Sequence, residues 1–492
     1  MSSFSDRLSF FSKRSGMNAK YLSEASGIEY TLLVKIRNGT RPAASRESLQ
    51  KLMDVLQLSV SERAELTSEW EIEKVGELLY NQFLAIRKMV ESMKNIPSLR
   101  MTGETGTEKD MILEGSRELS NRADLGHALH LILEAAGNKA GERVEIHTNS
   151  LSEGFMNHLS TALREYPSMP VYHILSLLPV RAAKETPVTN IERITQILPL
   201  FYFRNNYHSL TCHEENITAD NYFLFPNVVI SNSMLMIVNN NWDRGLMTGD
   251  PHMIQGAHRL FEEQYHVSRP INVEFFSLQQ EMDFFTKQYQ KNGTNWRYAV
   301  SCQPCILHFV TENDIASVTL SPLIPDSILQ IFCDSYRNLP PLQLKNRVTF
   351  FMREGLIDFM ETGVIEELPT GAASPLPMKN RVQILRRMIQ SAKTGQMHPR
   401  MIKPERMSIP YKTSVNCQNS LSYITLPSRD IDPNVRGYFM LESGLAALMW
   451  NFMTFLDERD FWTWSEAETI RIMEETLSVY ERAEQDTEKS TG

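Results

Sequence analysis

The chain contains 492 residues, of which 42% are hydrophobic and 22% are charged, and its formal net charge is −9. This composition is that of an ordinary soluble globular protein, and the length predicts about two to four domains. No apolar run approaches the ~20 residues of a transmembrane helix, and the first residues lack the apolar core of a signal peptide. Five cysteines in so long a chain do not indicate a disulfide scaffold. We therefore expect a cytoplasmic protein without a membrane partner.

The charge is distributed unevenly along the chain. Residues 1–60 contain nine lysines and arginines against five acids, a net charge of +4, which leaves −13 for the remaining residues. A basic first segment followed by an acidic body is expected if only the first segment meets phosphate groups.

The stretch 18–41, NAKYLSEASGIEYTLLVKIRNGTR, predicts two short helices joined by a turn. Leu22 and Ala25 form the inner edge of the first helix, and Gly27 can adopt the positive φ that ends it. Two short helices that meet at a glycine turn have the geometry that places the second helix in a DNA major groove.

The second of these helices has distinct inner and outer sides. Leu33 and Ile36 point inward at an i, i+3 spacing, and Asn38–Gly39 ends the helix. The outer side then carries Tyr30, Thr31 and Lys35.

The segment resembles the Cro/Xre-type phage-repressor helix-turn-helix domains. The residues that carry the resemblance are Leu22, Ser23, Gly27, Ile28, Leu33, Ile36, Asn38, Gly39 and Pro42, followed by SLQKLMDVLQLS at 48–59. The resemblance covers residues 1–66 and implies four or five helices that bind double-stranded DNA, with a homodimer on two half-sites. The chain departs from the family at Ala19, where many relatives carry a DNA-contacting glutamine. It departs again at Arg37 and Ser12, where an acid and its basic partner are common.

The expected DNA contacts fall into two groups. Base-edge contacts are expected from the hydroxyls of Tyr30 and Thr31, from Lys35 at guanine acceptors and from Leu32 by apolar contact. Phosphate contacts that set the register are expected from Asn18, Asn38, Thr40 and Arg41.

A linking helix is expected after this domain. Ser59 and Glu62 form a capping box that opens one long helix to about Lys94, so that residues 67–95 link the head to the body. Its apolar seam can pair two subunits or dock on the chain's own body; the seam contains Ile72, Val75, Leu79, Phe83, Ile86, Val90 and Met93. Residues 96–110 are polar and rich in glycine and threonine, which predicts a linker or loop.

Residues 111–275 predict an α/β domain with a sensor role. Expected helices (111–137, 151–166, 190–202 and one opened by Asp250–Pro251) alternate with strands at 144–148 and 171–179 and a buried hairpin around Ser231–Ser233. The strand pair followed by Gly-Asp-Pro and a helix with Phe261 resembles phospholipase-D-like sensor folds. The His-x-Lys signature of the enzymes of that fold is absent from the sequence, so the resemblance implies a sensor without catalysis.

Residues 276–484 predict a second, mixed α/β region with a helical C-terminus, followed by a frayed tail at 485–492. Helices are expected at 279–290, 346–363, 380–392, 438–456 and 466–484, the last capped by Ser465 and Glu468, and strands within 306–320 and 400–428. No internal repeat is visible in the sequence. The fold class is therefore multidomain, with an all-α head and an α/β body.

Several motifs contain cysteine and histidine residues of the kind found in chemical sites. Cys302-Gln-Pro-Cys305 with His308 lacks the second pair that a zinc site needs, and strand-like ILHFV follows it where a thioredoxin-type pair would open a helix. We expect a pair of buried cysteines. His127 and His130 share a helix face without an HExxH motif, and Cys212–Glu215 is a loose polar cluster.

The remaining acids and motifs give no sign of an enzyme. Glu354, Asp358 and Glu361 are expected on a solvated face, and no nucleophile elbow, Walker loop or dinucleotide fingerprint occurs. We expect no catalytic residue, no metal and no cofactor.

The sequence thus predicts a sequence-specific transcriptional regulator, a repressor or ligand-responsive switch, with a large sensor or interaction region. The expected partners are double-stranded DNA, a second copy of the chain and a small-molecule or protein effector. Two alternatives stay open: a protein-interaction regulator such as an antitoxin or defence-system controller, and an enzyme that uses the head for targeting to DNA.

Overall fold

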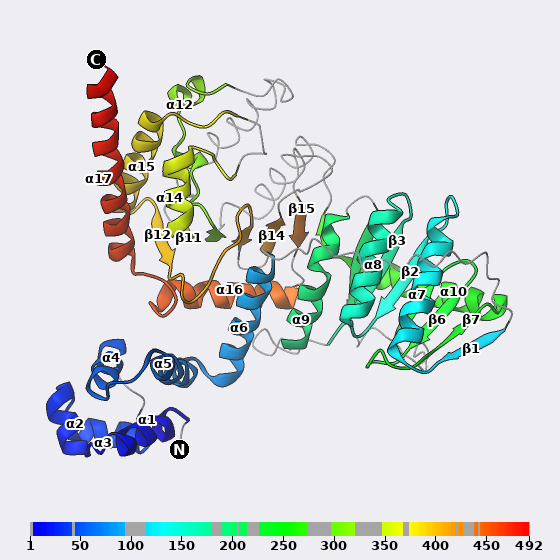
Figure 1. Ribbon diagram of the computed structural model, residues 1–492, viewed down its shortest axis with the longest axis horizontal. Helices are drawn as coiled ribbons and strands as arrows, with labels where there is room; N and C mark the ends of the chain where they lie inside the picture. The colour runs from blue at the N-terminus through cyan, green and yellow to red at the C-terminus, as the bar shows by residue number, and fades with distance from the viewer. Residues whose placement is uncertain are drawn as a thin grey trace. The chain divides into compact units, whose positions relative to one another are not determined.

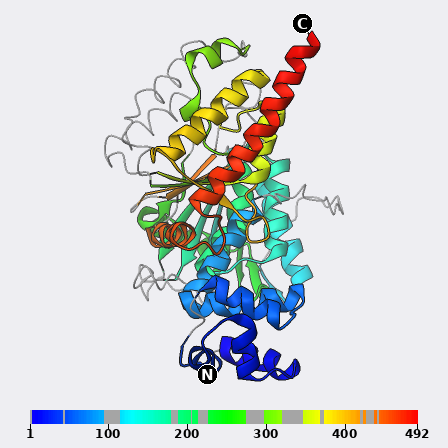
Figure 2. The same ribbon diagram turned by 90° about the vertical axis from the view of Figure 1, so that its left-hand side faces the viewer.

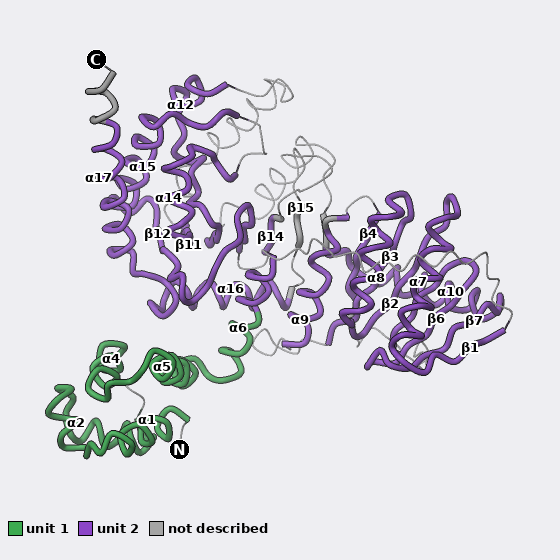
Figure 3. The backbone as a smooth tube through the Cα atoms, in the orientation of Figure 1, with its two compact units in different colours: residues 1–85 green, residues 86–492 purple. Residues whose placement is uncertain are grey.

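The computed structural model describes most of the chain. The described residues are 3–41, 45–93, 115–178, 188–203, 206–213, 226–273, 297–319, 347–367, 373–418, 422–426, 437–440 and 443–491. The linker expected at 96–110, the helix expected at 279–290 and Pro42 lie outside them. The backbone forms two compact units, Met1–Ala85 and Ile86–Gly492 (Figure 3). The predicted fold class is confirmed, because a helical head is followed by mixed α/β sheets and a helical C-terminus.

The first unit is entirely helical. It contains α1 (Ser3–Arg14), α2 (Ala19–Ser26), α3 (Tyr30–Arg37), α4 (Arg46–Val55), α5 (Val60–Val75) and the start of α6 (Glu77–Ser92). Its core is made by fully buried side chains from five helices: Phe4, Leu8, Leu22, Leu33, Leu49, Leu52 and Leu66. The two short helices expected within 18–41 are therefore present, each with its apolar side toward this core.

Two expectations in this unit were wrong. Ala25 is exposed, and Ser26 is buried in its place and donates a 2.5 Å hydrogen bond to the carbonyl of Leu22. The single long helix from Ser59 is interrupted at Gly76, whose φ of 94° and ψ of 136° strongly favour glycine. The capping box of Ser59 and Glu62 is confirmed.

The second half of α6 docks on the chain's own body. Ile86, Met89, Val90 and Met93 are buried, although Met89 was not among the expected seam residues. Arg87 donates to the carbonyl of Arg406 at 3.1 Å and lies over the Trp462 ring, and Glu91 accepts from the amide of Ser408 at 3.1 Å. This half of the seam is thus used within the chain.

The first sheet of the second unit has the strand order β1-β7-β6-β5-β2-β3-β4-β8. The central strands β2 (Val144–Thr148), β3 (Val171–Leu177) and β4 (Tyr207–His213) are parallel. The others are antiparallel: β1 (Ser116–Leu119), β5 (Asn227–Ile230), β6 (Leu235–Val238), β7 (Gly245–Thr248) and β8 (Arg269–Pro270). Most expected elements occur, but β1 lies within a predicted helix, and strands β4, β7 and β8 were not predicted.

Helices cover both faces of this sheet. They are α7 (Arg122–Gly137), α8 (Glu153–Glu165), α9 (Val188–Ile197) and α10 (Pro251–Val267) (Figure 1). Ile254, Ala257 and Phe261 of α10 pack in a cluster with Ile174 and other apolar strand residues. Phe155 of α8 contacts His173, which points to the opposite face because successive side chains alternate. The parallel strands are therefore buried on both sides.

The second sheet has the order β12-β11-β10-β13-β14-β15-β9. Its strands are β9 (Asn272–Val273), β10 (Tyr298–Ser301), β11 (Val348–Met352), β12 (His398–Ile402), β13 (Ser414–Cys417), β14 (Ser422–Leu426) and β15 (Gly437–Met440). Around it lie the 3-10 turn Leu307–Phe309, α12 (Glu312–Ala316), α14 (Arg353–Thr362), α15 (Met378–Lys393), α16 (Ser443–Glu458) and α17 (Glu466–Thr491). Figures 1 and 2 both show α17 running alongside α15.

Three expectations for this region were wrong. The expected helix at 346–363 contains strand β11 before α14, the strand-like stretch 306–310 contains the 3-10 turn Leu307–Phe309, and residues 437–440 form β15 before α16 begins. Short runs of large apolar residues fit a buried strand as well as a buried helix, so periodicity alone could not separate them. The backbone of α17 continues to Thr491, beyond the expected helix end at residue 484.

The two sheets share one topology, so we call the first sheet with its helices the first repeat and the second sheet with its helices the second repeat. The sequence itself shows no internal repeat. Each sheet has three parallel strands at one side, an antiparallel meander that starts beside the first of them, and its N-terminal strand antiparallel at the far end of the meander. Thus β9 to β15 correspond in order to β1 to β7, with β8 as an addition to the first sheet. The same strand order recurs in two different sequences because it depends on which strands are buried and not on the identity of each residue.

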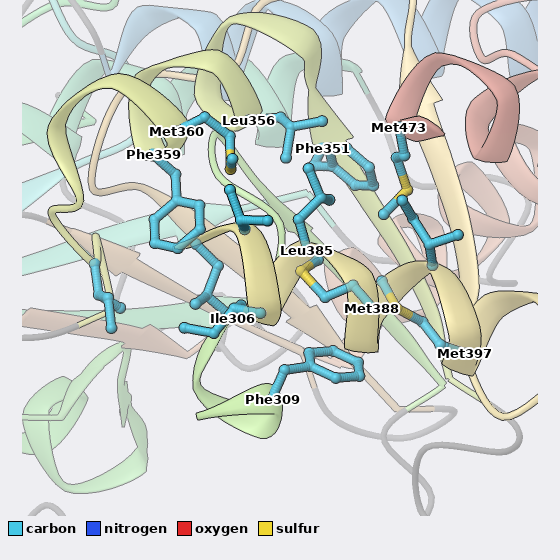
Figure 4. Close-up of a cluster of buried hydrophobic side chains, with 14 of the residues drawn as sticks. Ile306, Phe309, Phe351, Leu356, Phe359, Met360, Leu385, Met388, Met397 and Met473 are labelled. Atoms are coloured by element: carbon cyan, nitrogen blue, oxygen red, sulfur yellow. The ribbon is translucent and has the colours of Figure 1, made fainter. Parts of the chain in front are cut away.

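An apolar cluster fixes the helices of the second repeat. Phe351 of β11, Leu356 and Phe359 of α14, Leu385 of α15 and Met473 of α17 are fully buried together (Figure 4). Among the described residues, no helix is both long and apolar enough to cross a membrane.

Replacing Leu385 by alanine should destabilise the second unit. The side chain is fully buried in this cluster, so the variant loses transfer free energy and leaves a cavity, at a cost of about 2–5 kcal/mol. Thermal unfolding followed by circular dichroism measures the effect. Gln390→Ala on the exposed side of α15 is the control and should change stability by less than about 0.5 kcal/mol. Equal losses in both variants would contradict the placement of this helix.

Candidate nucleic-acid interface

The turn between α2 and α3 is held by local hydrogen bonds. The Asn18 side chain caps α2 by accepting from the amide of Tyr21 at 2.9 Å. Gly27 has φ 67° and ψ 17°, the left-handed conformation that ends the helix at little cost. The Ser23 hydroxyl then donates to the carbonyl of Ile28 at 2.6 Å. These contacts fix the direction in which α3 leaves the turn.

The outer side of α3 is composed as expected from the sequence. Tyr30 is 51% exposed, Thr31 and Lys35 are exposed and Leu32 is half-buried, whereas Leu33 and Ile36 are buried. The hydroxyl of Thr31 is hydrogen-bonded to the carboxylate of Glu29. The four residues expected at base edges thus lie on one helix with accessible side chains, and their contacts with DNA stay a prediction.

The residues expected at phosphates surround the ends of these helices. Asn18 and Asn38 are exposed at the starting cap of α2 and the end of α3. The amides of Thr40 and Arg41 and the hydroxyl of Thr40 all donate to the carbonyl of Lys35, at 2.9, 3.2 and 3.0 Å. The side chain of Arg41 is exposed beyond this turn. Asn18 and Thr40 therefore already have structural bonds, and Arg41 is the most available of the four for a phosphate.

Cations in the first unit fall into two groups. Four of them are paired: Arg7 with Glu65 at 3.5 Å, Arg14 with Glu62, Arg63 with Asp54 at 2.6 Å and Lys51 with Glu47 at 2.7 Å. Six others have no carboxylate within ion-pair distance among the described residues: Lys13, Lys20, Lys35, Arg37, Arg41 and Lys74. Three of these six, Lys20, Lys35 and Arg41, are exposed on α2, α3 and the turn after α3.

The two departures from the Cro/Xre pattern have structural explanations in part. Ser12 is fully buried and donates to the carbonyl of Met17 at 3.2 Å, so this position contributes to the chain turn instead of an ion pair. Arg37 is half-buried, and its backbone carbonyl accepts from Ser9 at 3.3 Å. Ala19 is the first residue of α2, and nothing else in the structure explains it.

Two histidines on the strands of the first sheet, the fully buried His173 and the half-buried His147, were not singled out from the sequence. His173 is hydrogen-bonded to Thr148 at 2.8 Å and to the Tyr207 hydroxyl at 2.7 Å, and burial together with His147 lowers its pKa to about 3. His147 is hydrogen-bonded to Ser176 at 2.8 Å, and burial lowers its pKa to about 4. A histidine inside an apolar strand run, as in VEIHT and VYHILSLL, is the signal that could have found them.

The histidines and the cysteine singled out from the sequence around the first sheet are not grouped as metal ligands among the described residues. His127 is exposed, while His130 lies 3.6 Å from the Glu134 carboxylate and has its ring 6.5 Å from that of His158. Cys212 is buried beside Ser176, and Glu214 and Glu215 lie outside the described residues. The described part of the chain brings no three histidine, cysteine or acidic side chains together as metal ligands would require.

The Cys302–Cys305 motif is built into the second repeat. It directly follows β10, and Cys305 is buried and donates to the Glu367 carboxylate at 2.8 Å. Burial and Glu367 raise the pKa of this thiol, so its thiolate is disfavoured. Cys302 is only half-buried, which corrects the expectation of two buried cysteines.

Burial also lowers the pKa of His308, to about 3. Glu354 and Glu361 are exposed as expected, but Asp358 is half-buried and accepts from the Gln303 amide at 3.2 Å.

Comparison with known proteins gives no assignment. No family model and no curated protein matches the chain. A solved structure of TrmBL2, described as an archaeal chromatin protein with a novel mode of DNA binding, has 11% identity and a TM-score of 0.23 over 43% of this chain and 71% of that one. A phosphatidylserine synthase from Haemophilus influenzae has 11% identity and a TM-score of 0.23 over 77% and 95% of the two chains.

A polyphosphate kinase from Porphyromonas gingivalis has 8% identity and a TM-score of 0.22 over 78% and 59%. Similarities of this size define neither a family nor an activity.

The buried histidines should make the second unit sensitive to acid. An unfolded histidine has a pKa near 6.5 and binds a proton as the pH falls below that value, whereas folded His173 stays neutral down to a pH of about 3. Stability is therefore unchanged by this residue above pH ~6.5 and falls by about 1.4 kcal/mol per pH unit below it. The free energy of unfolding, measured with urea at pH values of about 7.5 and 5.5, should decrease between them in the wild type. In His173→Gln this decrease should be about 1.4 kcal/mol smaller. An identical pH dependence of the two proteins would contradict a neutral buried His173.

Proposed function

We propose that this chain is a sequence-specific DNA-binding transcriptional regulator of the Xre-like class, in which residues 1–66 read DNA and the body carries a sensor or interaction role. The observation that supports it best is the outer side of α3. Tyr30, Thr31 and Lys35 are exposed there, and the lysine has no carboxylate partner among the described residues. A recognition helix needs accessible hydrogen-bonding side chains and uncompensated positive charge.

The side chains on α3 suit base edges in different ways. Lys35 donates to the O6 and N7 acceptors of guanine, the tyrosine hydroxyl donates or accepts, and Leu32 can pack on a thymine methyl group. The carboxylate of Glu29, which now holds the Thr31 hydroxyl, is a possible acceptor for the cytosine amino group. Binding to DNA then exchanges an internal hydrogen bond for two contacts with bases.

Phosphate contacts set the position of α3 in the groove. Arg41 and Lys20 lie at the end of α3 and the start of α2, and both are exposed. Each phosphate that such a side chain neutralises releases about one counterion, so binding should weaken steeply as salt rises. Two half-sites read by a homodimer would add the affinity that one short helix lacks.

The test begins with selection of DNA fragments by the purified full-length protein, from random genomic DNA and from its own promoter region, at two salt concentrations. Lys35→Ala should then lose about 1–3 kcal/mol of discrimination between the selected site and random DNA. Arg41→Ala should weaken binding to both DNAs alike and lower the salt slope by about one. Gel-shift titration measures both effects.

Lys51→Ala is the matched control, because Lys51 is exposed on α4 and paired with Glu47. Its binding should equal that of the wild type. If Lys35→Ala loses as much affinity for random DNA as for the selected site, Lys35 does not read bases. If the wild type binds no DNA at low salt, the proposed function is wrong for the isolated chain.

A further inference from the structure

A cavity of about 500 Å³ opens at the carboxyl end of β2 in the first repeat. It lies between α7, the first turn of α8 and the turn that joins β6 to β7. Its size falls in the range of small-molecule sites, about 300–1,000 Å³. In open sheets with parallel strands and covering helices, ligands bind outside the carboxyl ends of the strands. The position and the size both favour a ligand site.

Polar side chains without internal partners line this cavity. The described residues provide no hydrogen-bond or ion-pair partner for the side chains of Arg122, Asn157, His158, Asn240 and Asn241. The Glu153 carboxylate is likewise without one. Elsewhere in this repeat, polar side chains such as Asn227 and Thr148 are fully used by their neighbours. Several exposed hydrogen-bonding side chains are thus grouped around one hollow.

The walls of the cavity are held in place by buried contacts. The Asn227 side chain accepts from the amides of Asn149 and Ser150 at 3.0 and 3.1 Å and donates to the carbonyl of Asn239 at 3.0 Å. Trp242, with φ 54°, donates from its indole to the carbonyl of Ser150 at 3.1 Å, and its ring lies 4.6 Å from that of Phe155. The two loops that border the cavity are therefore fixed before any ligand binds.

At the equivalent place in the second repeat, a buried side chain bonds within the chain. The residues after β10 include Gln303, which is 1% exposed. Its amide group donates to the carbonyl of Val364 at 3.0 Å and accepts from the amide of Glu366 at 2.9 Å. One repeat thus satisfies its own polar groups at this strand end, and the other leaves an open, polar cavity.

We propose that this cavity binds a mononucleotide. Arg122 and the amides of Glu153 and Gly154, which remain open because Ser152 caps only the amide of Phe155, suit the phosphate, and a carboxylate such as that of Glu153 suits ribose hydroxyls. The side-chain amides of Asn240 and Asn241 offer donors and acceptors to a base edge, above a floor of Leu125, Leu129 and Leu151. One ligand with an anion, hydroxyls and a flat polar ring uses all of these groups. Binding at this site does not depend on whether residues 1–66 bind DNA.

Isothermal titration calorimetry of the full-length protein tests this proposal, with AMP, GMP, CMP and UMP as probes. At least one of them should bind, and adenosine and inorganic phosphate should each bind far more weakly. Arg122→Gln should lower the affinity for the nucleotide by roughly tenfold or more, because the charged contact to the phosphate is lost. Arg164→Gln, at the exposed far end of α8, is the matched control and should bind as the wild type does.

A second variant tests the shape of the site without changing its charge. A methyl group at Gly126 would lie 2.9 Å from Nε2 of His158, so Gly126→Ala must displace that ring and should lower the affinity several-fold. Thermal unfolding without nucleotide should be the same in the two arginine variants and the wild type, which separates binding from folding. The proposal is overturned if none of the four nucleotides binds, if Arg122→Gln binds as tightly as the wild type, or if inorganic phosphate binds as tightly as the nucleotide.

Discussion

The body of this protein depends on one constraint, the burial of three adjacent parallel strands on both faces. Parallel strands joined by crossover helices are covered on both sides, so their side chains cannot rely on water. His147 and His173 point to opposite faces of the first sheet, and each is hydrogen-bonded to a hydroxyl and has its pKa lowered by burial. Polar groups that a ligand could use are therefore confined to the ends of the strands.

The same constraint explains why the polar groups at corresponding strand ends differ between the two repeats. Their strand orders agree, yet after the carboxyl end of β10 the buried Gln303 side chain bonds to Val364 and Glu366. The carboxyl end of β2 instead opens into a cavity whose loops are tied down by Asn227 and Trp242. In a duplicated fold, the end of one strand can have a structural role while the equivalent end in the other repeat stays open. This is because the shared strand order depends only on burial of the apolar faces of the sheets.

The helical head is organised by a different balance, between apolar burial and ion pairing. Leu33 and Ile36 fix α3 on the core, and this leaves Lys35 on the outer side. Arg14 and Arg63 are neutralised by acids of neighbouring helices, so they add little net field. Lys35 on α3 and Arg41 in the turn after it are among the cations without an acidic partner in the described residues, and phosphate binding requires such charge.

The sequence by itself determined the features that depend on neighbours along the chain. The glycine turn at Gly27, the caps at Asn18 and Ser59 and the amphipathic spacing of Leu33 and Ile36 act within a few residues, so their structural roles could be predicted. Tertiary structure decided whether residues 346–363 contain a strand, because a run of large apolar residues satisfies either a buried strand or a buried helix until its partners are known. It also decided the repeat and the cavity at β2, since both arise from side chains that meet only when distant strands pair.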